Sequence, residues 1–243
     1  MLTRQKVVNH YDELAKKAQL AITQPDSNMD DLPPALCRAL AMQTTDGKIE
    51  HPFTATNDAA LKWIRLGTHR LAVYLAETAL PVMQFLPLQG HQVSANMMLN
   101  LAYIESGLQT LYLLDEAKPA FVAEWTSMIV WVERSSAFAG QLLTSSTFPN
   151  LPHCTFLSLK SLQHIPPNNV LGFASDYALA ENLYHEALHQ ELAAWLLHQP
   201  VLSDNYQSSQ ADKIAVPWRG GAWEPDRVFH AIYVYSHLIP FRQ

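Results

Sequence analysis

The chain has 243 residues, 49% of them hydrophobic, which is enough to bury one sizeable core. Its 22 acidic residues outnumber the 16 basic ones, for a formal net charge of −6, and no basic cluster could follow a phosphate backbone, which argues against a nucleic-acid partner. The two cysteines, Cys37 and Cys154, lie far apart in the sequence, which argues against a disulfide framework or a thiolate zinc site and fits a reducing cytoplasm.

The apolar segments predict no membrane span. The most apolar run, Met128 to Val132, is far too short to cross a bilayer, and the start of the chain, Met1 to Lys17, has no apolar core of a signal peptide. We therefore expect a cytoplasmic protein that does not engage a membrane.

The first half of the chain predicts helices separated by loops rich in Pro, Asp and Gly. The third of these helices would begin at Asn57 or Asp58, either of which is a good N-cap. In chain order the expected helices are Thr3 to Ala21, Ala35 to Gln43, Asn57 or Asp58 to about Leu80, and Val93 to Leu114 with a stripe of Met97, Met98, Leu101, Ile104, Leu108 and Leu111.

The second half predicts both helices and strands. Pro119 begins an apolar run that we interpret as a helix followed by a strand at about Ser127 to Val132, where β-branched and aromatic residues dominate. Further expected elements are short strands at Cys154 to Leu159 and Asn169 to Phe173, a helix from Asp176 to Leu197, and a last helix from Pro225 to about Leu238.

The long helix carries an H-E-x-x-H motif formed by His185, Glu186 and His189. Residues four apart lie on one face of a helix, so both imidazoles can reach one divalent ion, with the Glu186 carboxyl beside it. In a chain with eleven histidines a chance occurrence has a probability of roughly one or two per cent, so a metal site explains the motif better than chance does.

Two histidines leave too many positions of a metal ion open, so the motif calls for a third protein ligand. His230, on the last helix, is the leading candidate and lies 41 residues after His189. The spacing and the lack of the glycine in H-E-x-x-H-x-x-G-x-x-H exclude that short peptidase pattern. A peptidase that takes a glutamate ligand from a later helix stays open, although that helix offers only Glu224, at its start.

Four segments together resemble the HExxH-type α-ketoglutarate-dependent peptide β-hydroxylases, also described as HExxH putative peptide-modification domains. The resemblance covers roughly the C-terminal half, and Ala231 stands where members often have glycine. The segments are Ser145 to Pro152, Leu183 to Gln190, Pro217-Trp218-Arg219 and Val228 to Tyr233.

The resemblance implies a non-haem Fe(II) site held by His185, His189 and His230, with α-ketoglutarate and O₂ at the remaining positions. Zinc, the alternative metal, would offer no redox chemistry. Glu186 would be a further ligand or would orient an imidazole.

The resemblance also implies a site for the cosubstrate. The planar guanidinium of Arg219 suits a bidentate pair with the distal carboxylate of α-ketoglutarate, although a surface arginine in a turn is the plainer interpretation. Trp218 would wall the pocket or pack in the core. Tyr233, one turn after His230, would hydrogen-bond to a ligand or simply pack in the core, and His237 is expected to be structural.

Three classes of function follow. The first is an Fe(II)/α-ketoglutarate-dependent oxygenase that hydroxylates the β-carbon of a residue in a ribosomally synthesised precursor peptide. The second is a zinc metallopeptidase with Glu186 as general base, and the third is a helical module that binds a peptide without catalysis.

The expected fold is α+β and predominantly helical, formed by one domain over residues 1–243. Residues 1–120 would be a helical scaffold, and residues 121–243 would be the metal-site half, with a small sheet next to a zincin-like H-E-x-x-H helix. No pattern in the sequence indicates an oligomeric state.

Overall fold

The computed structural model describes residues 43–45, 48–50, 61–66, 69–75, 88–148, 151–198, 201–202, 206–208, 211–217 and 221–243. Its centre is a mixed sheet of six strands in the order β3-β4-β6-β8-β7, with β5 paired to β6 beyond that path. β4, β6 and β8 are mutually parallel, whereas β3, β5 and β7 run antiparallel to their neighbours. These strands are β3 (Leu61–Leu66), β4 (His69–Tyr74), β5 (His91–Val93), β6 (Met128–Arg134), β7 (Ser145–Phe148) and β8 (Leu151–Leu157).

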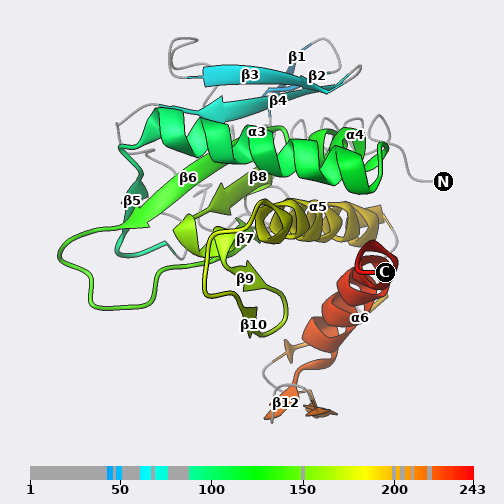
Figure 1. Cartoon of the computed structure of the whole chain (residues 1–243). Coiled ribbons are helices and arrows are strands. Elements are labelled where there is room, and N and C mark those ends of the chain that lie inside the picture. The colour runs from blue at the N-terminus through cyan, green and yellow to red at the C-terminus, as the bar shows by residue number, and fades with distance from the viewer. Residues whose placement is uncertain are drawn as a thin grey trace, which may run out of the picture.

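The described residues contain four α-helices, and three of them, α3, α4 and α6, pack against the fourth, α5. Figure 1 shows α3 and α5 running side by side and α6 leading away from α5. The helices are α3 (Met97–Leu114), α4 (Lys118–Trp125), α5 (Asp176–His198) and α6 (Pro225–Phe241).

The remaining elements are short. The first strands described, β1 (Gln43–Thr45) and β2 (Lys48–Glu50), form a separate antiparallel pair. The others are a 3-10 helix (Leu159–Leu162) and two antiparallel pairs, β9 (His164–Ile165) with β10 (Asn169–Val170), and β11 (Ile214–Val216) with β12 (Gly221–Trp223).

The central strands divide the core into two clusters by the alternation of their side chains. Val73 and Ile129 belong to the cluster that includes the helices, whereas their neighbours Ala72 and Val130 belong to the other cluster. All four are buried, as expected of strands covered on both faces. The helix-side cluster also contains Leu101, Ile104, Leu108, Leu111, Leu179, Leu183 and Leu188.

A glycine brings α3 and α5 close together. A Cβ atom built on Gly107 would lie 2.9 Å from Cγ of Leu179, which is closer than packed carbon atoms approach. This contact supports the helix that carries the H-E-x-x-H motif.

In the second half of the chain the predicted helices are confirmed and the strands are confirmed in part. The helix and strand after Pro119 are α4 and β6, and the two long helices are α5 and α6. The strand predicted at Cys154 to Leu159 overlaps β8 only as far as Leu157, the one predicted at Asn169 to Phe173 ends at Val170, and β7, β9, β11 and β12 were not predicted. The helix predicted at Val93 to Leu114 is α3, which begins four residues later because Val93 ends β5. Its stripe is buried from Leu101 onwards, but Met98 is 74% exposed. The α+β class is thereby confirmed.

The helix predicted from Asn57 or Asp58 to about Leu80 is wrong, because residues 61–66 and 69–74 form the antiparallel strands β3 and β4. In β4 the consecutive residues 71–74 are all buried, so the strand lacks the polar alternation that would have distinguished it from a helix. A helical N-terminal half is not what the described residues show, since those before α3 with regular structure are strands.

The two remaining predicted helices lie in parts of the chain that the structure does not describe, apart from one residue. The helix at Thr3 to Ala21 lies outside the described residues, as does the helix at Ala35 to Gln43 except for Gln43, the first residue of β1. Among the described helices, none combines the length and the apolar character that a membrane crossing requires.

Candidate metal centre

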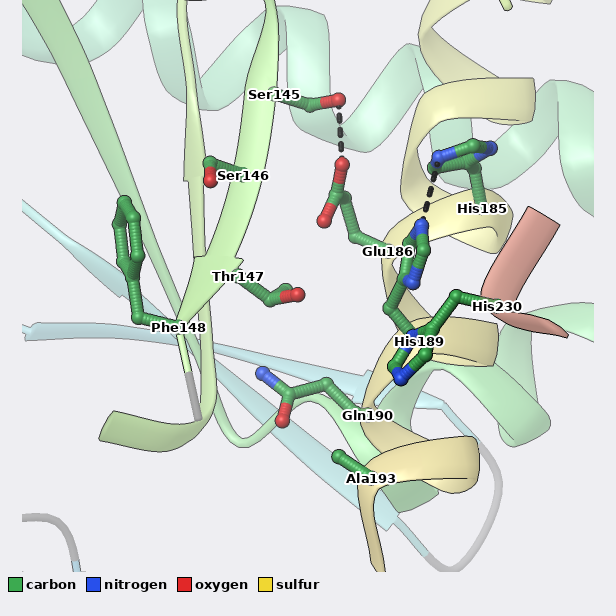
Figure 2. Close-up of a pocket in the computed structure, with 10 residues that line it drawn as sticks. All are labelled: Ser145, Ser146, Thr147, Phe148, His185, Glu186, His189, Gln190, Ala193 and His230. Carbon is green, nitrogen blue, oxygen red and sulfur yellow. Dashed lines mark hydrogen bonds between the residues drawn. The ribbon is translucent and has the colours of Figure 1, made fainter. Parts of the chain in front are cut away.

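Helix α5 places the two motif histidines together. His185 and His189 are one turn apart, their ring centroids are 4.8 Å apart, and their Nε2 atoms are separated by 3.1 Å (Figure 2). Two nitrogens that each bind one ion at about 2.1 Å, with an angle between about 90° and 110°, lie about 3.0 to 3.4 Å apart. The separation of the two nitrogens is therefore compatible with joint ligation of one metal ion, which would replace the hydrogen bond that now joins them.

His230 reaches the same place from α6. Its ring centroid lies 5.8 Å from that of His189, with 23° between the ring planes. A nitrogen lone pair lies in the ring plane, so His230 must turn before it can point at the ion that His185 and His189 would share. Accordingly, no group of three or more His, Cys, Asp or Glu side chains in the described part of the chain is already arranged around one ion.

All three histidines favour the neutral form that a metal requires. Burial, reinforced by the neighbouring His189, lowers the pKa of His185 well below its usual range. Burial and the nearby His230 lower the pKa of His189 to about 4. Burial also lowers the pKa of His230, although Asp226 opposes the shift. At neutral pH protons would therefore not compete with a metal for these nitrogens.

The acid of the motif is bound to the edge strand β7. Ser145 Oγ donates a hydrogen bond of 2.7 Å to Glu186 Oε1, and Thr147 lies near enough to the carboxyl group to oppose the rise in its pKa. Glu186 is only 4% exposed, and this burial outweighs both effects and raises its pKa to about 7. Figure 2 shows Glu186 lying between β7 and α5.

These groups border a cavity of about 400 Å³ between β7 and the two helices. One of its walls is fixed by Gln190, whose amide bonds the backbone of β8 twice, at His153 N–H and at the Cys154 carbonyl. The cavity is lined by Ser145, Ser146, Thr147, Phe148, His185, Glu186, His189, Gln190, Ala193 and His230.

A second layer supports His185. The ring of Tyr235 lies 6.1 Å from the His185 ring, and the guanidinium of Arg242 is near enough to contribute to its lowered pKa. Arg242 itself donates to the fully buried Glu181 and to the Pro166 carbonyl. Sequence reasoning missed this layer, and the available signal was that Glu181 precedes His185 by four residues, on the same face of the helix.

Other predicted residues are not brought to the cavity. The hydroxyl of Tyr233 donates a 2.6 Å hydrogen bond to Glu191, so it joins α6 to α5. His237 is exposed, and its Nδ1 lies 2.8 Å from the Tyr233 carbonyl oxygen. Trp218 and Arg219 lie outside the described residues, between β11 and β12 in the sequence.

No family model matches the chain, and a search of curated proteins found no match. The chemistry of the site therefore rests on its own residues: three neutral imidazoles and one buried acid beside a cavity. Such a set can hold a divalent metal on one side and leave the cavity side open to other ligands.

Proposed function

We propose that the protein is an Fe(II)/α-ketoglutarate-dependent oxygenase that hydroxylates the β-carbon of a residue in a ribosomally synthesised precursor peptide. The observation that carries the proposal is the meeting of His185, His189 and His230 on one side of the cavity. The resemblance of the C-terminal half to peptide β-hydroxylases supports the choice of reaction.

The three histidines would hold the ion in this proposal. When bound, Fe(II) supplies the one-electron chemistry by which one atom of O₂ enters the substrate and the other enters succinate, as α-ketoglutarate loses CO₂. The protein's own contribution is to present neutral imidazoles from two helices and to keep one side of the site open to the cavity.

Glu186 is a positioning residue in this proposal. The hydrogen bond from Ser145 directs its carboxyl group to β7 and joins that strand to α5. A carboxyl group held in this way keeps the adjacent His185 in place.

Arg219 completes the proposal as the residue that pairs with the distal carboxylate of α-ketoglutarate. It follows β11 and precedes β12, which in turn leads into α6, the helix that carries His230. A bidentate, charge-assisted pair would orient the cosubstrate beside the metal ligands.

A zinc peptidase is the second candidate, and a specific observation favours it. Glu186 lines the same cavity as the histidines, and its pKa of about 7 is the value that suits a general base near neutral pH. In that case Oε1 would keep the Ser145 bond while Oε2 accepts a proton from a water molecule in the cavity.

The two candidate functions differ in the metal that they require and in whether they need O₂. We expect anaerobic protein reconstituted with Fe(II) to develop a visible charge-transfer band when α-ketoglutarate is added, and to form succinate when O₂ is admitted with peptide. His237→Ala is the matched control and should keep both signals. Peptide cleavage by the zinc form without O₂, with no band and no succinate from the iron form, would favour the peptidase and refute the oxygenase.

A further inference from the structure

The first turn of α6 is hydrogen-bonded to the polar segment that precedes β11. The hydroxyl of Tyr206 donates a hydrogen bond of 2.7 Å to Oδ1 of Asp226, and Ser208 Oγ donates a second one of 3.3 Å to the same oxygen. The backbone N–H of Asp226 lies 3.5 Å from the Tyr206 hydroxyl. These contacts hold the carboxylate by Oδ1, and neither hydroxyl bonds to its other oxygen, Oδ2.

Two further contacts anchor the same turn. Lys213, just before β11, forms an ion pair of 3.0 Å with Glu224, the residue that precedes α6. The guanidinium of Arg227 lies 4.3 Å from the centroid of the Trp223 ring, at the end of β12. The start of α6 is therefore fixed by side chains other than the histidine that it carries, and a group in this turn is already in place before an ion arrives.

Asp226 lies one helical turn before His230, the proposed third ligand. Residues four apart share one face of an α-helix, with Cβ atoms about 5 to 6 Å apart, so a carboxylate and an imidazole at these positions can reach each other. Asp226 is also the only acidic residue of α6. Its charge opposes the effect of burial, which lowers the pKa of His230. A fixed carboxylate therefore lies beside the third ligand.

His230 has to be reoriented before it can bind an ion. Its ring lies against that of His189, with 23° between the ring planes (Figure 2). An imidazole that binds a metal through one nitrogen carries a proton on the other, and a hydrogen bond from that N–H to a carboxylate or carbonyl fixes the orientation of the ring. The metal-bound form of His230 therefore needs an acceptor, and Asp226 is the acid within reach on its own helix.

We propose that Asp226 is a positioning residue for His230. When His230 turns to bind the metal ion through one ring nitrogen, the N–H of the other nitrogen donates to Asp226, which the two hydroxyls of the preceding segment hold in place. This inference rests on the proposed function for the identity of the third ligand. It adds that the segment before β11 helps to build the metal site, although Tyr206 and Ser208 do not themselves line the cavity.

Metal affinity without turnover tests the role of Asp226. The probe is Zn(II), whose dissociation constant is measured by competition with a chromophoric chelator at pH 8, where the lowered pKa values keep all three histidines neutral. We expect Asp226→Ala to weaken binding about tenfold to a hundredfold, and Asp226→Asn, which keeps a neutral acceptor, to weaken it less. Asp212→Asn is the matched control, because it removes the same charge from an exposed residue just before β11 and should leave the affinity unchanged.

Tyr206→Phe tests whether the preceding segment acts through Asp226. The variant keeps the ring and removes the hydroxyl that bonds to the carboxylate. We expect it to weaken zinc binding about threefold in the wild type and to cause no further loss in Asp226→Ala, since the two residues act in one chain. Equal losses in both backgrounds would mean that Tyr206 supports the fold alone and would overturn this part of the inference. Melting temperatures of the metal-free variants show that each is folded.

Two results would overturn the role of Asp226 itself. The first is a folded Asp226→Ala variant that binds zinc as tightly as wild type. The second is loss of binding in both Asp226→Ala and Asp226→Asn as complete as in His230→Ala, which would make Asp226 a ligand. Either result leaves the proposed ligand set intact, whereas full binding by His230→Ala would refute that set together with the inference. Zinc binding requires neither O₂ nor α-ketoglutarate, so its outcome is independent of the oxygenase assay.

Discussion

Replacing Glu186 with glutamine should change how the stability of the metal-free protein depends on pH. Burial raises the pKa of this carboxyl group from 4.5 to about 7 in the folded state. A group whose pKa is higher in the folded protein contributes stability that is fully present below 4.5 and is lost as the pH rises through about 7. Glutamine has nearly the same shape and does not titrate, so the variant lacks this loss.

The size of the effect follows from the two pKa values. Between about pH 5 and about pH 8, the linkage relation gives a loss of about 2 to 3 kcal/mol from Glu186 in the wild type. Contributions from the neighbouring histidines occur in both proteins and largely cancel in the difference. The free energy of unfolding of Glu186→Gln, relative to wild type, should therefore rise by about 2 to 3 kcal/mol over this range.

Urea unfolding in metal-free buffer at several pH values measures this difference directly. The amide oxygen of the variant can still accept the hydrogen bond from Ser145, and the part of that bond that depends on the charge of Glu186 is already contained in its folded-state pKa. If the two stability curves ran parallel to within about 0.5 kcal/mol, the carboxyl group would not be buried between β7 and α5 as described.

Three further predictions concern the ligands, the cosubstrate and the packing of α5. His230→Ala should abolish stoichiometric metal binding, because two remaining ligands hold an ion weakly, whereas His237→Ala should not; metal analysis after gel filtration decides, and the reverse result would reassign the third ligand. Arg219→Ala should raise the α-ketoglutarate requirement about thirtyfold or more, with partial rescue by Arg219→Lys, as read from succinate yield against α-ketoglutarate concentration; superimposable curves would remove Arg219 from the site. Gly107→Ala should destabilise the protein by about 1 to 2 kcal/mol, because overpacking against Leu179 outweighs the gain in helix propensity; thermal unfolding checks this, and a stabilised variant would contradict the close approach of α3 and α5.

The elements that were predicted correctly have strong local sequence signals, which tertiary packing does not override. α6 begins at Pro225, which suits the first position of a helix, and α5 is a long run of strong helix formers. β3 and β4 were missed although Trp63, Ile64, Val73 and Tyr74 favour strands, because Asn57 or Asp58 just before them makes a good N-cap and favoured a helix. Residues 71–74 of β4 are buried on both faces, so the alternation that identifies half-buried strands is absent.

The parts of the candidate site that were predictable are those formed by residues close together in the sequence. The spacing of His185 and His189 follows from the helical period, and His230 was inferred from the need for a third ligand. The anchoring of Glu186 by Ser145 was not predictable, because it depends on how an edge strand packs against a helix about 40 residues away in sequence. No helical or strand period encodes such a contact.

That anchoring links the two halves of the site. The carboxyl group that follows His185 in sequence accepts a hydrogen bond from Ser145 Oγ, so one side chain joins the metal helix to β7. The Ser145 bond uses Oε1 alone, so a positioning residue keeps it, and a general base could keep it as well and act through Oε2. The bond to β7 is therefore common to both candidate functions, and the identity of the metal and the need for O₂ are what distinguish them.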